Sequence, residues 1–162
     1  MTQIFIHGLD SSNQGTKARF FKDKYPLMII PNFDGPVQKR LEKLEEVLSG
    51  QSSIALIGSS LGGLMATMFA MDHPHRVERI ILLAPALPML DGLPEKRGKT
   101  ISIPTWLYHG TKDTLLPLDT VIPIARKIFA ELHLHVVEDD HMLHKTFRDI
   151  PWDELLGNSD PG

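Results

Sequence analysis

Short apolar runs alternate along the chain with longer stretches in which apolar residues recur every three or four positions. A short apolar run between turn signals predicts a buried strand, and the helical spacing predicts an amphipathic helix. Strands are predicted at residues 4–6, 27–30, 53–57, 77–83, 105–108 and 133–137. Helices are predicted at residues 15–25, 37–49, 61–71, 118–132 and 151–156. Apolar strands that alternate with helices favour a parallel sheet covered on both faces.

The stretch 37–49 shows the helical pattern most clearly, because its apolar residues share one face and its charged residues the other. The apolar residues are Val37, Leu41, Leu44, Val47 and Leu48. Gly50 follows, where helices commonly end in glycine. We therefore expect an α/β fold, a doubly wound and mostly parallel six-stranded sheet flanked by helices. Residues 1–157 are expected to form a single domain, and residues 158–162 a loose tail.

Composition is that of a globular protein and argues against several functions. Of the 162 residues, 42% are hydrophobic and 23% charged, close to the average for globular domains. The formal net charge of −3 leaves no basic excess for phosphate backbones, so nucleic acid is not an expected partner. The absence of cysteine excludes a thiol nucleophile and a cysteine-bound metal.

The start of the chain is unlike a signal peptide, and the longest apolar run, 80–90, is broken by prolines. We expect a cytoplasmic protein without a membrane span.

The third predicted strand is followed by Gly-Ser-Ser-Leu-Gly at residues 58–62 and then by an apolar helix. In a strand–turn–helix context this G-x-S-x-G pattern places the central serine, Ser60, on a sharp turn that lifts its hydroxyl above the sheet. The residues two positions before and two positions after Ser60 pack against each other beneath the turn, so both must be small. Gly58 and Gly62 satisfy that requirement. The pattern predicts Ser60 as a nucleophile; the alternative is a glycine-rich connection that only turns the chain.

A serine hydroxyl needs a neighbouring base, and the base needs a carboxylate that fixes its tautomer. Asp113 follows the fifth predicted strand, and His141 follows the sixth. The carboxyl ends of parallel strands share one edge of the sheet, where ligands bind. We therefore predict Ser60 as nucleophile, His141 as base and Asp113 as orienting acid. The carboxylates that could replace Asp113 are Asp91, Asp139 and Asp140.

Acyl transfer also needs two backbone N–H groups where the oxyanion forms. One is predicted to be that of Leu61, directly after the nucleophile. The other should come from the loop after the first strand, where Gly8 lets the chain turn inward. The N–H of Leu9 is the candidate.

These segments together resemble the α/β-hydrolase superfamily, and more narrowly small bacterial esterase-like hydrolases. The matching segments are HGLDSS at 7–12, GSSLGG at 58–63, LAPA at 83–86, HGTKD at 109–113 and DH at 140–141. The resemblance spans residues 3–157 and implies a serine hydrolase acting on small-molecule esters or thioesters, with Ser60, Asp113 and His141 as the triad. The first two strands of larger relatives are missing, and the lid, residues 86–100, is minimal.

The expected reaction proceeds through an acyl-enzyme intermediate and uses no metal or organic cofactor. One alternative is a non-catalytic ligand-binding protein on the same fold, because fold alone does not give function. Another is a metal site in a group of histidines near the C-terminus, since imidazole and carboxylate suit zinc or iron. Its candidate ligands are His133, His135, His141 and His144, with Asp139 and Asp140 between them. His7 and His109 are interpreted as hydrogen-bonded loop histidines. Acyl-chain length, the leaving group and the oligomeric state are left open.

Overall fold

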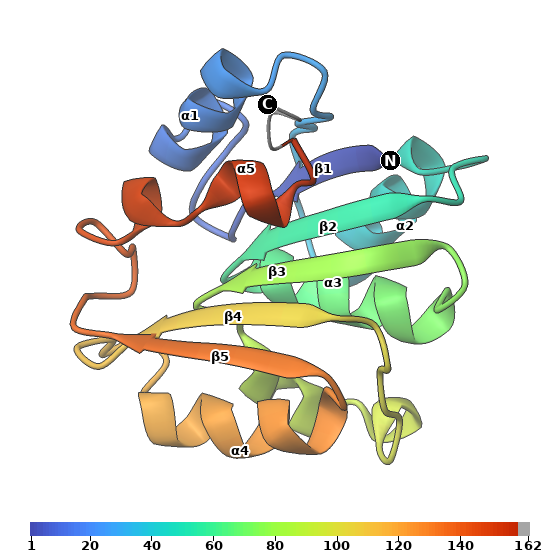
Figure 1. The fold of residues 1–162 in the computed structure, drawn as a ribbon. Coiled ribbons are helices and arrows are strands. Elements are labelled where there is room, and N and C mark those ends of the chain that lie inside the picture. Colours follow the sequence, from blue (N-terminus) through green and yellow to red (C-terminus); the bar gives the residue numbers. More distant parts are fainter. Residues whose placement is uncertain (159–162) are drawn as a thin grey trace.

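The computed structural model describes residues 1–158, which form one parallel sheet with helices on both faces (Figure 1). The strands, in spatial order, are β1 (Thr2–Ile6), β2 (Ile54–Ser59), β3 (Val77–Leu83), β4 (Thr105–Gly110) and β5 (Leu132–Val137). The α-helices are α1 (Thr16–Lys24), α2 (Val37–Val47), α3 (Leu61–Asp72), α4 (Leu118–Ile128) and α5 (Trp152–Leu155). Three 3₁₀ segments, η1 (Leu87–Gly92), η2 (Pro94–Lys96) and η3 (Phe147–Asp149), lie in the connections.

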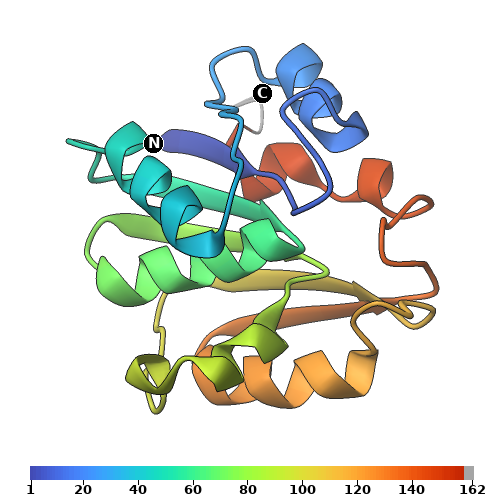
Figure 2. The ribbon, with the colours of Figure 1, turned by 180° about the vertical axis from the view of Figure 1, so that it is seen from behind.

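The sheet has a hydrophobic core on each face, because successive side chains of a strand point to opposite sides. Ile4 and Ile6 of β1 face the core that contains α2, α3 and α4, which lie in front of the sheet in Figure 2. Phe5 faces the other core, which contains α1 and α5. All the strands pair in parallel. The predicted doubly wound α/β architecture is therefore confirmed, with the carboxyl ends of all strands at one edge.

The sheet has five strands rather than the six predicted from the sequence. Residues 27–30 were expected to be a strand, but they contact β1 only through an isolated bridge between Ile4 and Ile29. Pro26 and Pro31 flank this segment, and a proline has no N–H with which to continue a ladder. The segment still runs beside β1 on the side away from β2. The chain order therefore reverses between β1 and β2, where ligands bind in open sheets of this kind.

Two predicted boundaries near the C-terminus also differ. The helix expected at 118–132 ends at Ile128, because the next residues pair with the chain before β4: Ala130 donates to the carbonyl of Ile101. Asn158, the first residue of the predicted loose tail, donates its N–H to the carbonyl of Asp153 and its side chain accepts from Gln3. The rest of that tail, 159–162, lies outside the described residues.

Helix α3 is apolar on nearly all sides because it is buried between the sheet and other elements. Its residues Leu61 to Ala70 are buried, and it contacts β2, α2 and η1. Over residues 1–158, no helix combines the length and the apolar character that a membrane crossing needs.

The start of α3 approaches the ends of β1 and β2 so closely that only glycine fits at the contact. A Cβ atom on Gly62 would lie 2.0 Å from the carbonyl oxygen of Ile6, and one on Gly58 would lie 2.3 Å from the carbonyl oxygen of Gly62. These neighbours are backbone atoms and cannot turn away as a side chain would. The two glycines therefore fix how the turn between β2 and α3 sits on β1.

We expect Gly62→Ala to lower the free energy of unfolding by about 3 kcal/mol, the upper end of the cost of overpacking, because the added methyl meets backbone. Gly92→Ala is the matched control, since a Cβ there would have no atom within 4 Å. Urea unfolding of both variants measures the difference. Equal stability of the two would contradict the close approach of α3 to β1.

Candidate active site

Ser60 lies in the turn between β2 and α3 with a backbone conformation that a serine rarely adopts. Its φ is 55° and its ψ is −116°. Positive φ is unfavourable for a residue with a Cβ and persists only where the surroundings enforce it. Four backbone hydrogen bonds do so here. The N–H of Ser60 donates to the carbonyl of Leu83 (2.9 Å), and its carbonyl accepts from the N–H groups of Gly63 (3.0 Å), Leu64 (3.3 Å) and Ala86 (2.9 Å).

The structure brings the side chains of Ser60, His141 and Asp113 together. His141 Nε2 lies 3.1 Å from Ser60 Oγ, and His141 Nδ1 lies 2.6 Å from Asp113 Oδ2. Because an ionised carboxylate only accepts hydrogen bonds, Nδ1 carries the ring proton and donates a hydrogen bond to Asp113. The lone pair of Nε2 is then free to accept from the Ser60 hydroxyl. The three residues come from the connections after β2, β4 and β5.

The Asp113 carboxylate is buried and held by its own loop. Its Oδ1 accepts from the N–H groups of Leu115 (3.0 Å) and Leu116 (2.8 Å), which leaves Oδ2 for the imidazole. The loop is fixed in turn by His109, whose Nε2 donates to the carbonyl of Leu116 (2.7 Å). Gly110 lets the ends of β4 and β5 meet, since a Cβ there would lie 2.2 Å from the carbonyl oxygen of Asp139.

The other candidate carboxylates have different surroundings. Asp139 is buried and accepts from the N–H groups of Asp140, Lys145 and Thr146. Burial would raise its pKa, but these hydrogen bonds favour the charged form and hold the pKa below its usual value. Asp140 contacts His144 Nδ1 at 2.6 Å, and Asp91 is exposed in η1. Asp113 is therefore the carboxylate that faces His141.

The loop after β1 lies against Ser60, as expected for the second oxyanion donor. A Cβ on Gly8 would lie only 3.2 Å from the Cβ of Ser60. The N–H of the next residue, Leu9, donates to no protein acceptor within residues 1–158. Leu61 is the first residue of α3, and the first N–H groups of a helix have no acceptor inside it. Both predicted donors thus lack a protein acceptor within residues 1–158, and Leu9 lines the same two cavities as Ser60.

His7 fixes the loop that carries Leu9. Its Nδ1 donates to the carbonyl of Gly8 (2.7 Å), and its Nε2 accepts from the N–H of Phe33 (2.8 Å). Burial lowers the pKa of His7, and the nearby charges of Arg40 and Lys43 act in the same direction. Burial also lowers the pKa of His109. Both rings are therefore held neutral, in the structural roles expected from the sequence.

Two cavities flank the Ser60–His141 pair, and Leu9 and Leu115 line both of them. The first, of about 290 Å³, is mostly apolar and is bounded by η1 and the starts of α2 and α3. Its side chains include Val37, Leu61, Ala86, Met89 and Leu116. The second, of about 260 Å³, lies between the loop after β1, the start of α1 and the loop after β5. Its polar residues include Asp10, Ser11, Thr16, Lys17 and Ser59. Ser60 and His141 are thus open to ligands on both sides.

Two charged residues near this site were not found in the sequence analysis. Arg40 of α2 is buried, donating through Nε to the carbonyl of Gly35 (2.8 Å) and through Nη2 to that of Leu9 (3.5 Å). Lys17 of α1 lines the second cavity and donates to the carbonyl of Met142 (2.7 Å). Isolated basic residues on predicted helices carry no sequence signal that separates them from ordinary surface charges.

The C-terminal histidines do not converge in the structure. His133 and His135 stack on Trp106 and Tyr108 on the sheet surface, whereas His141 faces Asp113 and His144 faces Asp140. In the described part of the chain, no group of three or more acidic, histidine or cysteine side chains is placed to hold a metal ion.

Sequence comparison gives a match to one protein family. Residues 34–97, from the segment before α2 through η2, match the family described as alpha/beta hydrolase fold. This region contains the turn with Ser60. No curated protein matches the chain.

Solved structures with this fold include an alpha/beta hydrolase domain-containing protein 10 from mouse. It is 21% identical, has a TM-score of 0.76, and the match covers 96% of this chain and 89% of that one. An esterase from Exiguobacterium antarcticum is 16% identical, with a TM-score of 0.71 and coverage of 97% and 91%. A monoacylglycerol lipase from Paleococcus ferrophilus is 13% identical, with a TM-score of 0.69 and coverage of 97% and 94%. At identities this low, the structural similarity shows a shared fold and no more. The chain therefore has the α/β-hydrolase fold.

Proposed function

We propose that this protein is a serine hydrolase that cleaves small-molecule carboxylic esters or thioesters through an acyl-enzyme intermediate. The observation that carries the proposal is the hydrogen-bonded series Ser60–His141–Asp113, with distances of 3.1 and 2.6 Å, on a strained turn. A serine that only turned the chain would need neither the imidazole nor the buried carboxylate behind it. The esterase and the lipase among the structural neighbours are consistent with this chemistry.

In the first step Ser60 Oγ attacks the carbonyl carbon while His141 Nε2 takes the hydroxyl proton. The carbonyl oxygen becomes an oxyanion, which the N–H groups of Leu9 and Leu61 bind. His141 then gives its proton to the leaving oxygen or sulfur, the bond to the acyl carbon breaks, and Ser60 is left acylated. All these groups belong to the chain itself.

In the second step water takes the place of the leaving group. His141 removes a proton from the water as it attacks the acyl carbon, and returns that proton to Ser60 Oγ as the acid is released. Asp113 stays ionised throughout and stabilises the imidazolium that forms twice per turnover. The N–H groups of Leu115 and Leu116 keep its charge aimed at the ring.

Replacing the nucleophile tests the proposal first. Ser60→Ala is expected to lower kcat for p-nitrophenyl butyrate by on the order of 10⁶, because no group remains to form the acyl-enzyme. Hydrolysis is followed by the absorbance of nitrophenolate, and circular dichroism verifies the fold. The exposed Ser49→Ala serves as the matched serine control. Activity in Ser60→Ala equal to that of the control would rule out Ser60 as the nucleophile.

The role of the carboxylate is tested by Asp113→Asn, which keeps the shape of the side chain but favours the wrong imidazole tautomer. We expect kcat to fall by on the order of 10⁴. Asp140→Asn is the comparison, because Asp140 adjoins His141 in sequence yet contacts His144. A larger fall in kcat for Asp140→Asn than for Asp113→Asn would assign the orienting role to Asp140.

The base is tested through the pH dependence of kcat/KM for a neutral ester, because an imidazole protonated on both nitrogens cannot accept the Ser60 proton. Activity is expected to fall in acid while the protein is still folded. A rate that stays constant down to the pH at which the protein unfolds would exclude His141 as the base.

Loss of the fold must be separated from loss of the base. Burial lowers the pKa of His7 and His109 below the ordinary value of 6.5, so the unfolded chain binds protons that the folded protein does not. Their contribution to stability is therefore complete above about pH 6.5 and is lost as the pH falls below it. Circular dichroism at each pH identifies the range in which the protein stays folded, and only rates within that range test His141.

A further inference from the structure

Apolar side chains line much of both cavities beside Ser60, but only the second, here called the polar cavity, also holds charged side chains, Lys17 and Asp10. A substrate attached to Ser60 must place one part in each cavity. At the tetrahedral stage the acyl carbon carries the oxyanion, the acyl chain and the leaving group. An acyl chain suits the cavity bounded by Val37, Leu61 and Met89 because it buries apolar surface there. The same chain would desolvate the Lys17 ammonium, the Asp10 carboxylate and several hydroxyls in the other cavity, which is unfavourable without new hydrogen bonds. The leaving group is therefore assigned to the polar cavity.

Lys17 is the cationic side chain of that polar cavity. Its Nζ donates one hydrogen bond, to the carbonyl of Met142 (2.7 Å), although an ammonium has three protons to donate. No carboxylate of residues 1–158 forms an ion pair with it. Asp10 lines the same cavity, and within residues 1–158 it forms no ion pair with Lys17. The charges of Asp139 and Asp140 also act on Lys17, but their carboxylates are hydrogen-bonded to backbone N–H groups and to His144. Lys17 is half-buried, and this burial lowers the pKa of its ammonium.

We propose that Lys17 selects substrates whose leaving group carries a negative charge. The inference rests on the proposed hydrolase function and names the substrate class of that same site. The Lys17 ammonium also lies 5.4 Å from the centre of the Phe147 ring, but of its three protons only the one donated to Met142 has an oxygen acceptor within residues 1–158. An anionic group in the polar cavity supplies a further acceptor, and a charge-assisted hydrogen bond is stronger than one between neutral groups. The Lys17 ammonium is hydrogen-bonded to Met142, the residue that follows His141. An ion pair between Lys17 and the leaving group therefore forms on the side from which His141 protonates the leaving atom.

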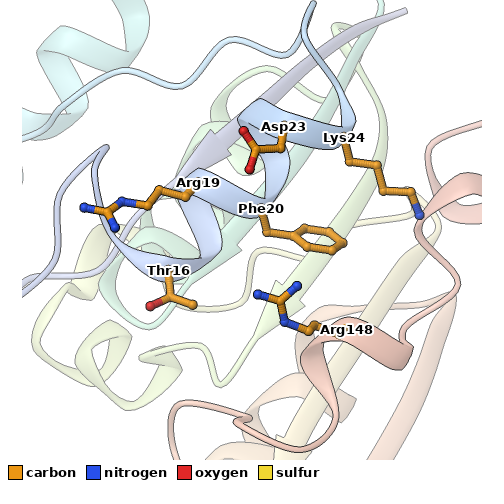
Figure 3. A pocket seen from close by; sticks show the side chains of 6 residues that line it. All are labelled: Thr16, Arg19, Phe20, Asp23, Lys24 and Arg148. Carbon is orange, nitrogen blue, oxygen red and sulfur yellow. The ribbon is translucent and has the colours of Figure 1, made fainter.

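Positive charge continues outward from this cavity along α1. Thr16 lines both the polar cavity and a surface hollow of about 580 Å³ between α1 and η3. Figure 3 shows the guanidinium of Arg148 turned toward the ring of Phe20, which it approaches to 5.5 Å from the centroid. The charged residues around the hollow are Arg19, Asp23, Lys24 and Arg148, three cations and one anion. An acidic leaving group that extends beyond Lys17 thus meets further cations and an aromatic face.

The test compares two esters that differ only in charge at the far end of the leaving group, 4-butyryloxybenzoate and 4-butyryloxybenzamide. The readout is the ratio of their kcat/KM values, each divided by the rate of hydrolysis by hydroxide to remove intrinsic reactivity. We expect the wild type to favour the benzoate and Lys17→Met to lower the ratio about tenfold, the effect of losing one charge-assisted hydrogen bond. Lys17→Arg should keep the preference because it keeps the charge.

Lys22→Met is the matched control. Lys22 lies on the same helix and also donates to a carbonyl, that of Asn13, but it does not line the cavity. Its removal lowers the net charge equally, so an unchanged ratio assigns the effect to position rather than to overall charge. A wild-type ratio near one, or an equal fall in Lys17→Met and Lys22→Met, would overturn the proposal. Hydrolysis of both esters that is lost in Ser60→Ala would in that case leave the hydrolase function standing.

Discussion

The site depends on the close contact between the start of α3 and the ends of β1 and β2. At Gly62 and Gly58 the backbones approach too closely for any side chain, and this contact fixes the turn that carries Ser60. The turn is strained, with a positive φ at Ser60, and hydrogen bonds with Leu83 at the end of β3 and with Ala86 directly before η1 hold it in place. Once Ser60 is fixed, the position of every other group in the site can be described relative to its hydroxyl.

The remaining groups reach Ser60 because parallel strands end at one edge. The connection after β1 supplies the free N–H of Leu9, the one after β4 supplies Asp113, and the one after β5 supplies His141. Each connection is held by buried polar contacts: His7 binds Gly8 and Phe33, His109 binds Leu116, and Asp139 binds the chain after His141. The neutral, buried His7 and His109 thus hold the loops in place, whereas His141 contacts Ser60.

Much of this arrangement could be predicted from the sequence, because it follows local patterns. The glycine-flanked Ser60 between an apolar strand and an apolar helix has a specific geometric meaning, and the order of strands places Asp113 and His141 at the same edge. The strand at 27–30 was predicted wrongly because its apolar residues suit a strand, whereas the flanking prolines restrict pairing to Ile29. The end of α4 was missed because its pairing partner, Ile101, lies far away in sequence.

Lys17 and Arg40 could not be predicted, since their surroundings are created by tertiary structure. In the sequence each is one of the 17 basic residues, and nothing distinguishes it from the solvent-exposed ones. In the fold, α1 places Lys17 beside Met142, 125 positions later, and α2 places Arg40 behind the Leu9 loop. The sequence therefore indicated Ser60, Asp113 and His141 but not the charged side chains around them.

The central claim is that Ser60 is a nucleophile activated by His141. The most direct measurement is treatment of the wild-type protein with a fluorophosphonate, followed by mass spectrometry of the intact protein and its peptides. A single adduct on Ser60 that forms more slowly as His141 is protonated is the predicted result. A folded protein that takes up no adduct, or takes it up at another residue, would contradict the claim.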